Sequence, residues 1–347
     1  MKKSSKSLTL AALLLSWQAF AGSQAYAQSG TDFYKSKRIF VVCSSAPGGG
    51  YDQYARLFAR HIGKHIPGEP TVVVQNMPGA EGIKAANYIY NVAPQDGTFI
   101  GALPRSIGLS KIYSVHEQSL KFDPLKFKWI GSLKRDIGVL VVNTKSGINK
   151  PDDLKTHEVT VSSQAINSPN SIYARMLNQL YGSKIKPVEG YEGSTAGMLA
   201  VERFETDGHI TGGTPTPVKN RILDWAKESK AKVVLQFGMH RDPDFPDAPT
   251  ALELISDPKG HQLFQIAFTE QEVGSPFVFG PNVPKEQYEI LLKAFKETYT
   301  DPEFIADAER EKAAIYALNA SDIITLFEEA YASPPAVLEE LRHLAGH

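Results

Sequence analysis

RIFVVCSSAPGGGYDQYARLFARHI, residues 38 to 62, places three glycines between an apolar run and an amphipathic segment. The apolar run at 38–43 is predicted to form a β-strand. Apolar residues then recur at helical spacing over 51–66, while Arg56, Arg60 and Lys64 are left for solvent, which predicts a helix. A second strand at 71–75 completes a βαβ unit. The glycines therefore lie where a parallel strand passes into a helix, the place where such sheets bind ligands.

The glycine loop itself favours an anion. Glycines allow the backbone to approach a ligand closely, and the free N–H groups of the first helical turn point at what binds there. A tight turn that needs glycine only for its backbone angles is the alternative. A dinucleotide fingerprint fails because Gln53 replaces its third glycine, and a phosphate-binding P-loop fails because Tyr51 follows Gly50. Asp52, in the first turn, is expected to cap the helix or orient the loop.

The rest of the chain continues to alternate strands and helices, which predicts parallel sheets with helical cover. We expect further strands at 98–103, 139–142, 158–162 and 231–237. Helices are expected near 82–91, 171–180, 193–204 and 219–228, with a helical tail from 284 onward.

The N-terminus has the three parts of a secretory signal: lysines at positions 2, 3 and 6, an apolar run at 8–20, and Ala25-Tyr26-Ala27. Cleavage is expected after Ala27, with a cut after Ala21 as the alternative. The apolar run is too short to span a bilayer. We therefore expect residues 1–27 to be a signal peptide and the mature chain to be a soluble periplasmic protein.

Composition narrows the class of protein further. The 347 residues carry a formal net charge of −1, and loss of the signal lysines makes the mature chain more negative, so a nucleic acid partner is not expected. Cys43 is the single cysteine and excludes an internal disulfide. A mature chain of roughly 320 residues exceeds one hydrophobic core. We therefore expect two domains.

The chain contains six short motifs in a specific order and spacing. They are APGGGYD at 46–52, VQN with PGA and Gly82 at 74–82, APQDGT at 93–98, GYEGS at 190–194, PDAPT at 246–250 and GPNVP at 280–284. With these motifs the mature chain resembles, over nearly its whole length, the extracytoplasmic solute receptors of tripartite tricarboxylate transporters, also called Bug- or TctC-type receptors.

The resemblance implies a periplasmic binding protein type II-like α/β fold. Two Rossmann-like lobes with mainly parallel sheets would be joined by a hinge that the chain crosses near residues 137 and 238, and would close around a ligand. This plan implies a discontinuous first domain, 28–137 plus 239–347, and a second domain at 138–238. It also implies capture of a small organic carboxylate and its delivery to integral membrane permease subunits, one large and one small. The receptor is expected to be a monomer without a cofactor or bound metal.

The resemblance also carries over a candidate site, made of the stretches 45–51, 162–170, 191–195 and 212–214. Hydroxyl and amide donors at the starts of two predicted helices support it from the residues alone, although ordinary helix capping explains them as well. The candidate ligand-binding residues are Ser45, Ala46, Gly48, Gly49, Gly50, Tyr51, Asp52, Arg105, Ser163, Gln164, Asn167, Ser168, Tyr191, Glu192, Gly193, Ser194, Thr195, Gly213 and Thr214.

Two candidates depart from the family pattern. Glu192 stands where the family more often has lysine, and it either points to solvent or pairs with an amine or hydroxyl of the ligand. Arg105 stands where the family usually has small residues, and it either grips a carboxylate or lies at the surface or the domain interface. On this basis Ser194→Ala and Arg105→Ala are each expected to weaken binding with little loss of folding stability.

Catalytic alternatives find little support. The sequence has neither a His-Glu-x-x-His zinc motif nor a Gly-x-Ser-x-Gly nucleophile elbow, and His209 is read as structural. A secreted hydrolase is the alternative from another class, and a receptor for an ABC importer or a sensor is a third. Dicarboxylates, tricarboxylates, aromatic acids and amino acids all remain open as ligands.

Overall fold

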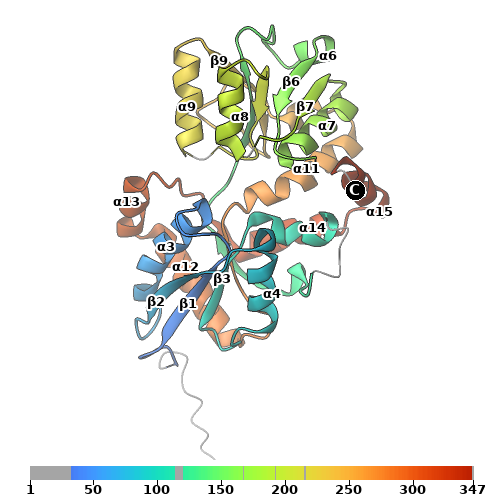
Figure 1. Ribbon diagram of the computed structural model, residues 1–347. Helices are drawn as coiled ribbons and strands as arrows, with labels where there is room; N and C mark the ends of the chain where they lie inside the picture. Colours follow the sequence, from blue (N-terminus) through green and yellow to red (C-terminus); the bar gives the residue numbers. More distant parts are fainter. Residues whose placement is uncertain (1–32, 114–119, 167, 192, 215, 346–347) are drawn as a thin grey trace, which may run out of the picture.

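The computed structural model describes residues 33–113, 120–166, 168–191, 193–214 and 216–345. Within them the chain forms two β-sheets with helices packed around each, and the sheets lie in separate halves of the molecule (Figure 1). We call the first sheet with its helices the first lobe, and the second sheet with its helices the second lobe. The predicted α/β class is confirmed. The expected signal peptide, 1–27, lies outside the described residues.

The first sheet contains the predicted βαβ unit. Strand β1 pairs in parallel with β2 on one side and with β3 on the other. Helix α3 connects β1 to β2 and is followed by the 3₁₀ helix η1, so the helix predicted at 51–66 is two elements. In order across the sheet the strands are β11 (Leu318–Asn319), β4 (Lys128–Ser132), β10 (Pro276–Phe279), β3 (Phe99–Ala102), β1 (Arg38–Cys43) and β2 (Thr71–Asn76).

The second sheet contains the other strands expected from the sequence, together with two short ones that were not expected. Strand β6 pairs in parallel with β7 and β8, while β5 pairs antiparallel with β8 and β9. In order across the sheet the strands are β7 (Ile185–Val188), β6 (Val159–Ser162), β8 (Gly208–Ile210), β5 (Gly138–Asn143) and β9 (Ala231–Phe237).

Both sheets are mixed, which corrects the expectation of mainly parallel sheets. The cause is the double crossing between the lobes. The chain leaves the first sheet at the end of β4 and returns at the start of β10, so these neighbours run antiparallel, with Ser132 opposite Pro276. It enters the second sheet through β5 and leaves through β9, which pair antiparallel with Gly138 opposite Phe237. Strands joined by helices within a lobe remain parallel.

The helices cover both sheets (Figure 1). The tail predicted to be helical from 284 onward contains α12 to α15 and is interrupted by the short strand β11. The helices are α3 (Gly50–Ile62), η1 (Gly63–His65), η2 (Ala80–Gly82), α4 (Ile83–Asn91), η3 (Arg105–Leu109), α5 (Ser110–Tyr113), η5 (Pro124–Lys126), α6 (Asp153–Thr156), α7 (Pro169–Tyr181), α8 (Gly193–Glu202), α9 (Thr216–Lys227), α10 (Ala251–Leu254), α11 (Pro258–Glu272), α12 (Lys285–Thr300), α13 (Pro302–Arg310), α14 (Ala320–Tyr331) and α15 (Pro335–Leu344).

Helices α11 and α15 connect the lobes on the side of the hinge. Tyr173 of α7 stacks on Phe237 of β9, with 5.0 Å between ring centroids, and meets Phe268 of α11 edge-on at 5.5 Å. Arg175 of α7 donates a hydrogen bond from Nε to the Leu344 carbonyl of α15 at 2.7 Å. The second lobe therefore packs directly on helices that follow it in the chain.

The loop after β9 also stays with the second sheet. The side-chain amide of Gln236 donates hydrogen bonds to the carbonyls of Phe245 and Ala248, at 2.8 and 2.7 Å, and Phe245 packs in an apolar cluster with Val139 and Ile222. The two-domain division with a boundary after 238 stays a prediction, and this packing favours a later boundary. In the described ranges, every helix lacks the length or the apolar character required to cross a bilayer.

Candidate ligand-binding site

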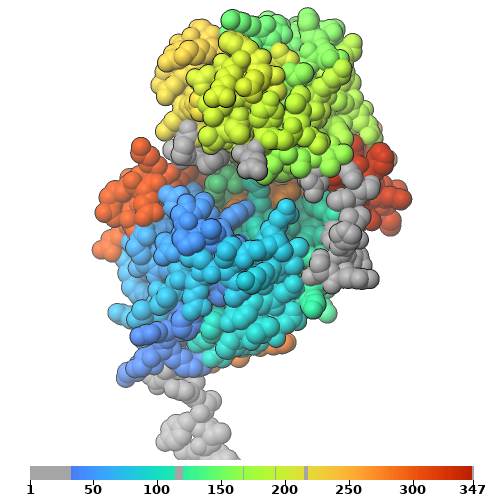
Figure 2. Space-filling model, viewed as in Figure 1, coloured from blue at the N-terminus to red at the C-terminus, as the bar shows by residue number. Residues whose placement is uncertain are grey.

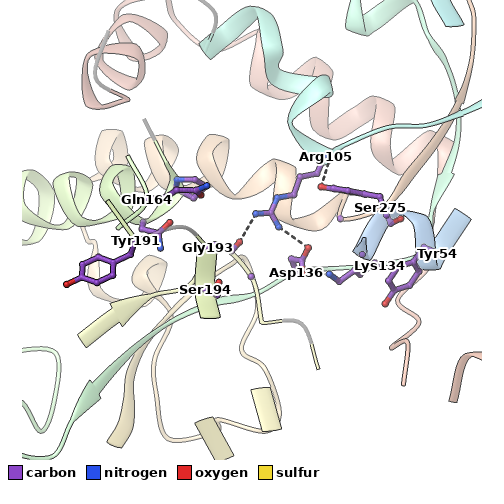
Figure 3. A pocket seen from close by; sticks show the side chains of 16 residues that line it. Tyr54, Arg105, Lys134, Asp136, Gln164, Tyr191, Gly193, Ser194 and Ser275 are labelled. Atoms are coloured by element: carbon purple, nitrogen blue, oxygen red, sulfur yellow. Dashed lines mark hydrogen bonds and ion pairs between the residues drawn. The ribbon is translucent and has the colours of Figure 1, made fainter. Parts of the chain in front are cut away.

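A cavity of about 500 Å³ lies between the two lobes, in the hollow that separates the green-yellow and blue parts of the molecule in Figure 2. Its wall combines the start of α3, the crossover segments and the loops that lead into α7 and α8 (Figure 3). The lining residues are Gly50, Tyr51, Tyr54, Arg105, Lys134, Asp136, Gln164, Pro169, Asn170, Tyr191, Gly193, Ser194, Gly212, Gly213, Gly274 and Ser275.

Asp52 holds the glycine loop in its conformation. Its Oδ2 accepts hydrogen bonds from the Gly48 N–H and from Arg56 Nε, both at 2.8 Å, and its Oδ1 accepts one from Asn76 Nδ2 at 2.7 Å. Burial opposes ionisation of this carboxyl, but the hydrogen bonds outweigh burial and hold the pKa of Asp52 below its ordinary value. Gly48 has a φ of +82°, which favours glycine. Asp52 thus orients the loop.

Only the end of the glycine loop reaches the cavity, where Gly50 and Tyr51 line the wall. The Asp52 carboxylate is buried and engaged by the loop. The hydroxyl of Ser45 donates to the neighbouring Ala46 carbonyl at 3.3 Å. The following candidates are not among the residues that line the cavity, and their ligand contact stays a prediction: Ser45, Ala46, Gly48, Gly49 and Asp52.

Asp52→Asn is expected to lower the free energy of unfolding by about 2 kcal/mol, because an amide cannot accept all of these hydrogen bonds and places N–H groups against N–H donors. Urea unfolding at neutral pH measures the loss. The matched control is Asp322→Asn, since Asp322 is an exposed acidic residue in the first turn of α14. An equal loss in both variants would show that Asp52 acts only on the helix dipole.

The second lobe contributes the loop between β6 and α7. Gln164 lines the cavity, as do Pro169 and Asn170 at the start of α7. Ser163 does not, because its buried hydroxyl bonds the hydroxyls of Ser171 at 2.6 Å and Ser168 at 3.0 Å. The Ser168 hydroxyl also donates to the Ala165 carbonyl at 2.6 Å. Both hydroxyls therefore shape the loop, and the ligand contacts expected of Ser163 and Ser168 stay predictions.

The loop into α8 supplies a further part of the wall. Gly193 is the first residue of α8 with a φ of +74°, and both Gly193 and Ser194 line the cavity. Tyr191 lines it as well, and its hydroxyl donates to Glu205 Oε2 at 3.3 Å. Thr195 is exposed and lies outside the wall, and its ligand contact stays a prediction.

The segment after β8 passes close to the hinge. Gly213 lines the cavity, and a Cβ added to it would lie 2.9 Å from Asp136 Oδ1, so a larger residue there would displace the Asp136 carboxylate. Thr214 does not line the cavity, because its hydroxyl donates to the Ile137 carbonyl at 2.8 Å. The ligand contact expected of Thr214 stays a prediction. The two remaining candidates, Asn167 and Glu192, lie outside the described residues.

Arg105 lines the cavity and also links the lobes (Figure 3). Its Nη1 pairs with Asp136 Oδ2 at 2.8 Å, and its Nη2 donates to the Gly212 carbonyl of the second lobe at 2.7 Å. Its backbone N–H donates to the Tyr51 hydroxyl at 3.2 Å. Burial opposes the charged guanidinium, but Asp136 and neighbouring groups raise the pKa of Arg105 above its ordinary value. Arg105 thus lies between the lobes, and its grip on a ligand carboxylate stays a prediction.

Several lining residues were missed by the sequence analysis. Lys134 and Asp136 lie on the first crossover, where Lys134 Nζ pairs with Asp136 Oδ1 at 2.7 Å. Gly274 and Ser275 lie on the second crossover, and the Gly274 N–H donates to the Lys134 carbonyl at 2.9 Å. The run of charges at 134–136, directly after a buried strand, is the one sequence signal that pointed here. Tyr54, one turn into α3, was also missed.

The cavity is built to attract an anion. Three helices begin at its wall, with Gly50, Pro169 and Gly193 as the first residues of α3, α7 and α8. Their free N–H groups and dipoles favour negative charge. Arg105 and Lys134 add two cations to the wall, against the single carboxylate of Asp136. None of the described lining residues is a histidine or a cysteine.

A group of possible metal ligands lies elsewhere, where His61, Asp301 and Glu303 come together on the first lobe. These groups are already paired. Lys64 Nζ lies 2.6 Å from Asp301 Oδ2 and 2.5 Å from Glu303 Oε2, and His61 Nε2 bonds Asp307 Oδ2 at 2.8 Å. We assign the group to ion pairing, and the expected absence of a metal stays a prediction.

Two mixed α/β lobes with an interlobe cavity define the architecture of the periplasmic binding proteins. Solved structures of other proteins with this fold superpose on the chain. A TctC solute-binding protein from Polaromonas superposes with a TM-score of 0.68, at 16% identity, over 90% of this chain and 99% of that one. An R. palustris protein with adipate gives 0.61, at 18% identity, over 89% and 97%. MatC from Rhodopseudomonas palustris with bound malate gives 0.56, at 18%, over 89% and 99%.

The sequence comparisons agree with the motifs. The chain is 24% identical to Protein BugT of Bordetella pertussis over 234 residues, which is 64% of this chain and 67% of BugT. It is 24% identical over 327 residues to a UPF0065 protein in the gbd 5' region of Cupriavidus necator, covering 91% of this chain and 90% of that one. No family model matches the chain. The relatives confirm the resemblance to Bug- and TctC-type receptors.

Proposed function

We propose that this protein is an extracytoplasmic solute receptor that captures a small carboxylate between its lobes and delivers it to a tripartite tricarboxylate-type membrane transporter. The observation that carries the proposal is the interlobe cavity, which is lined by three helix N-termini and two cationic side chains. A carboxylate accepts hydrogen bonds from several N–H groups at once and is stabilised by both the dipoles and the cations.

The relatives support the ligand class. Adipate and malate, which two of the structural neighbours hold, are small organic acids. In the proposed cycle, each lobe alone presents part of the donor set, so the contacts that the ligand makes with both lobes stabilise the closed state. The ligand is released unchanged, and the protein is a receptor, not an enzyme.

Location and partners follow from the same proposal. Residues 1–27 direct export, the mature receptor works in the periplasm as a monomer, and it docks on a permease with one large and one small membrane subunit. A receptor for an ABC importer or a sensor would bind its ligand in the same way. Transport assays with each type of permease would separate these partners.

The first test is a thermal-shift screen of residues 28–347 against small carboxylates, with phosphate, sulfate and neutral sugars as controls. A ligand that binds only the folded state raises the melting temperature in a concentration-dependent way. We expect such a rise with one class of carboxylate, and recovery of the compound intact. No rise with any acid would contradict the proposal, and chemical turnover of the acid would favour a hydrolase.

Ser194→Ala is expected to weaken carboxylate binding about threefold to tenfold, because one hydroxyl donor at the start of α8 is lost from the cavity wall. Isothermal titration calorimetry measures the change. Thr195→Ala is the matched control, since Thr195 is the exposed neighbour outside the wall. An unchanged affinity in Ser194→Ala, or an equal loss in both variants, would remove this hydroxyl from the site.

A further inference from the structure

Lys134 is held at one side of the cavity by the crossovers. Its carbonyl accepts hydrogen bonds from the Gly274 N–H at 2.9 Å and from the Ser132 hydroxyl at 3.2 Å, so its backbone position is fixed by both crossings. Its side chain is 21% exposed and reaches the cavity, with Nζ 5.8 Å from the centroid of the Tyr54 ring. This distance is within the range of a cation–π contact.

The ammonium group of Lys134 is only partly engaged. It carries three N–H donors, and within the described ranges its one ion-pair partner is Asp136 Oδ1, at 2.7 Å. Asp136 is shared, because its other oxygen pairs with Arg105. Arg105 is also committed to the Gly212 carbonyl. Both cations keep N–H donors for a ligand. Arg105 is held at two points, by Asp136 and by the Gly212 carbonyl, whereas Lys134 pairs with Asp136 alone, so Lys134 has the greater freedom to turn toward a ligand.

The charges around Lys134 leave the described wall positive. Two cations and one carboxylate line the cavity. Glu270 of α11 acts electrostatically on Arg105 without lining the cavity. Asp136 and Glu270 both act on Arg105, whereas Lys134 pairs with Asp136, so a ligand carboxylate near Lys134 would share the ammonium group with one protein carboxylate.

Lys134 also lies apart from the helix N-termini of the second lobe. In Figure 3 the Arg105–Asp136 pair stands between Lys134 with Tyr54 on one side and Gln164 with Tyr191 on the other. A ligand whose first carboxylate sits at the starts of α7 and α8 would extend past Arg105 toward Lys134. The second end of that ligand meets an ammonium group and the face of an aromatic ring.

We propose that Lys134 binds a second anionic group of the ligand, so that the receptor selects acids with two negative charges over matched acids with one. The inference rests on the proposed function and assigns the choice of ligand to a side chain that the family resemblance did not indicate. Lys134 acts here as a specificity-determining residue, and the first carboxylate is bound by the N–H groups of the second lobe.

The test compares matched acids by isothermal titration calorimetry: succinate with butyrate, and adipate with hexanoate. Within the pair that fits the cavity, the wild-type protein is expected to bind the diacid about tenfold or more tightly than the monoacid. Lys134→Met should remove most of this preference by weakening the diacid about tenfold, with less than about a threefold change for the monoacid. Lys134→Gln should do the same, and Lys134→Arg should keep part of the preference.

The matched control is Lys285→Met, which removes the same charge from a side chain that is 86% exposed at the start of α12. Its preference should equal that of the wild-type protein. Equal affinities of wild-type protein for both members of a pair, or equal losses for both acids in Lys134→Met, would overturn this inference and leave the proposed function standing. Failure of the wild-type protein to bind any of the four acids would count against both.

Discussion

Replacing Arg105 by alanine is expected to lower the free energy of unfolding by about 3 kcal/mol. The Arg105–Asp136 pair is largely buried, with side-chain exposures of 16% and 8%. Without the guanidinium, the Asp136 carboxylate keeps only Lys134 as a cationic partner, and the Gly212 carbonyl loses its donor. A buried charge or acceptor left without its partner loses the full benefit of solvation by water, and this loss is larger than the net value of the bond itself.

Urea unfolding at neutral pH measures this effect, with Arg241→Ala as the matched control. Arg241 pairs with Glu253 on the surface, where both side chains are 43% exposed, so its removal is expected to change stability by less than about 1 kcal/mol. A double variant, Arg105→Met with Asp136→Leu, removes both charges together and should recover part of the loss. Equal small losses for Arg105→Ala and Arg241→Ala would contradict the buried-pair account.

This prediction reverses the expectation drawn from the sequence, which gave Arg105→Ala a binding defect with little loss of stability. The partners of Arg105 explain why. Asp136 is 31 residues away in the sequence and Gly212 is 107 residues away, on the other lobe. Local sequence shows a long cationic side chain after a strand, and only the folded chain shows that it donates hydrogen bonds to Asp136 and to the Gly212 carbonyl.

The parts of the fold that were predicted correctly are those with strong local patterns. The strand β1, the glycine loop and α3 follow one another with clear apolar periodicity, and β9 was predicted with its observed bounds. The strands that were missed are short and paired over long distances. β8 has three residues, and β10 pairs antiparallel with β3 and β4 across a large gap in the sequence. Such strands exist because partner strands supply their hydrogen bonds.

The candidate site likewise contains residues that local sequence could place and residues that only the folded chain could. Gly50, Tyr51, Gln164, Gly193 and Ser194 lie at loops between strands and helices, and these could be placed from the order of elements alone. Which side chains in those loops turn toward the cavity could not be predicted, because hydroxyls such as that of Ser163 satisfy one another inside the loop. Lys134 and Asp136 come from the crossover, whose course depends on the packing of both lobes.

The second large effect is expected at His209, in the dependence of protein stability on pH. It is almost fully buried on β8, where its Nδ1 lies 2.8 Å from the Ser162 hydroxyl and 3.1 Å from the Ser162 carbonyl. Its Nε2 is buried without a hydrogen-bond partner among the described residues. We assign the single proton to Nδ1, which donates to the carbonyl, so that Nε2 is an unpaired acceptor. Gly197 packs so closely that an added Cβ would lie 2.3 Å from Nδ1. Protonation would therefore place an unpaired charge in the core.

Burial lowers the pKa of His209 from 6.5 to about 4, and this ties stability to pH. Between these values the unfolded chain binds a proton at this histidine and the folded chain does not, so the free energy of unfolding falls as the pH falls. The contribution is complete above pH 6.5 and is lost as the pH approaches 4, by about 3 kcal/mol in total. His209→Asn cannot take up a proton there, so its stability should fall with pH less steeply than that of the wild-type protein by this amount.

Urea unfolding at a series of pH values between 7 and 4 measures the two slopes, and the difference between them isolates His209 from the carboxyl groups that titrate in the same range. His157→Asn is the matched control, because His157 lies exposed beside Thr156 and its loss should leave the wild-type slope unchanged. Parallel pH profiles for the wild-type protein and His209→Asn would mean that the folded protein accepts a proton at His209 as readily as the unfolded chain. The buried Ser162–His209 contact would then have to open to water in the native state.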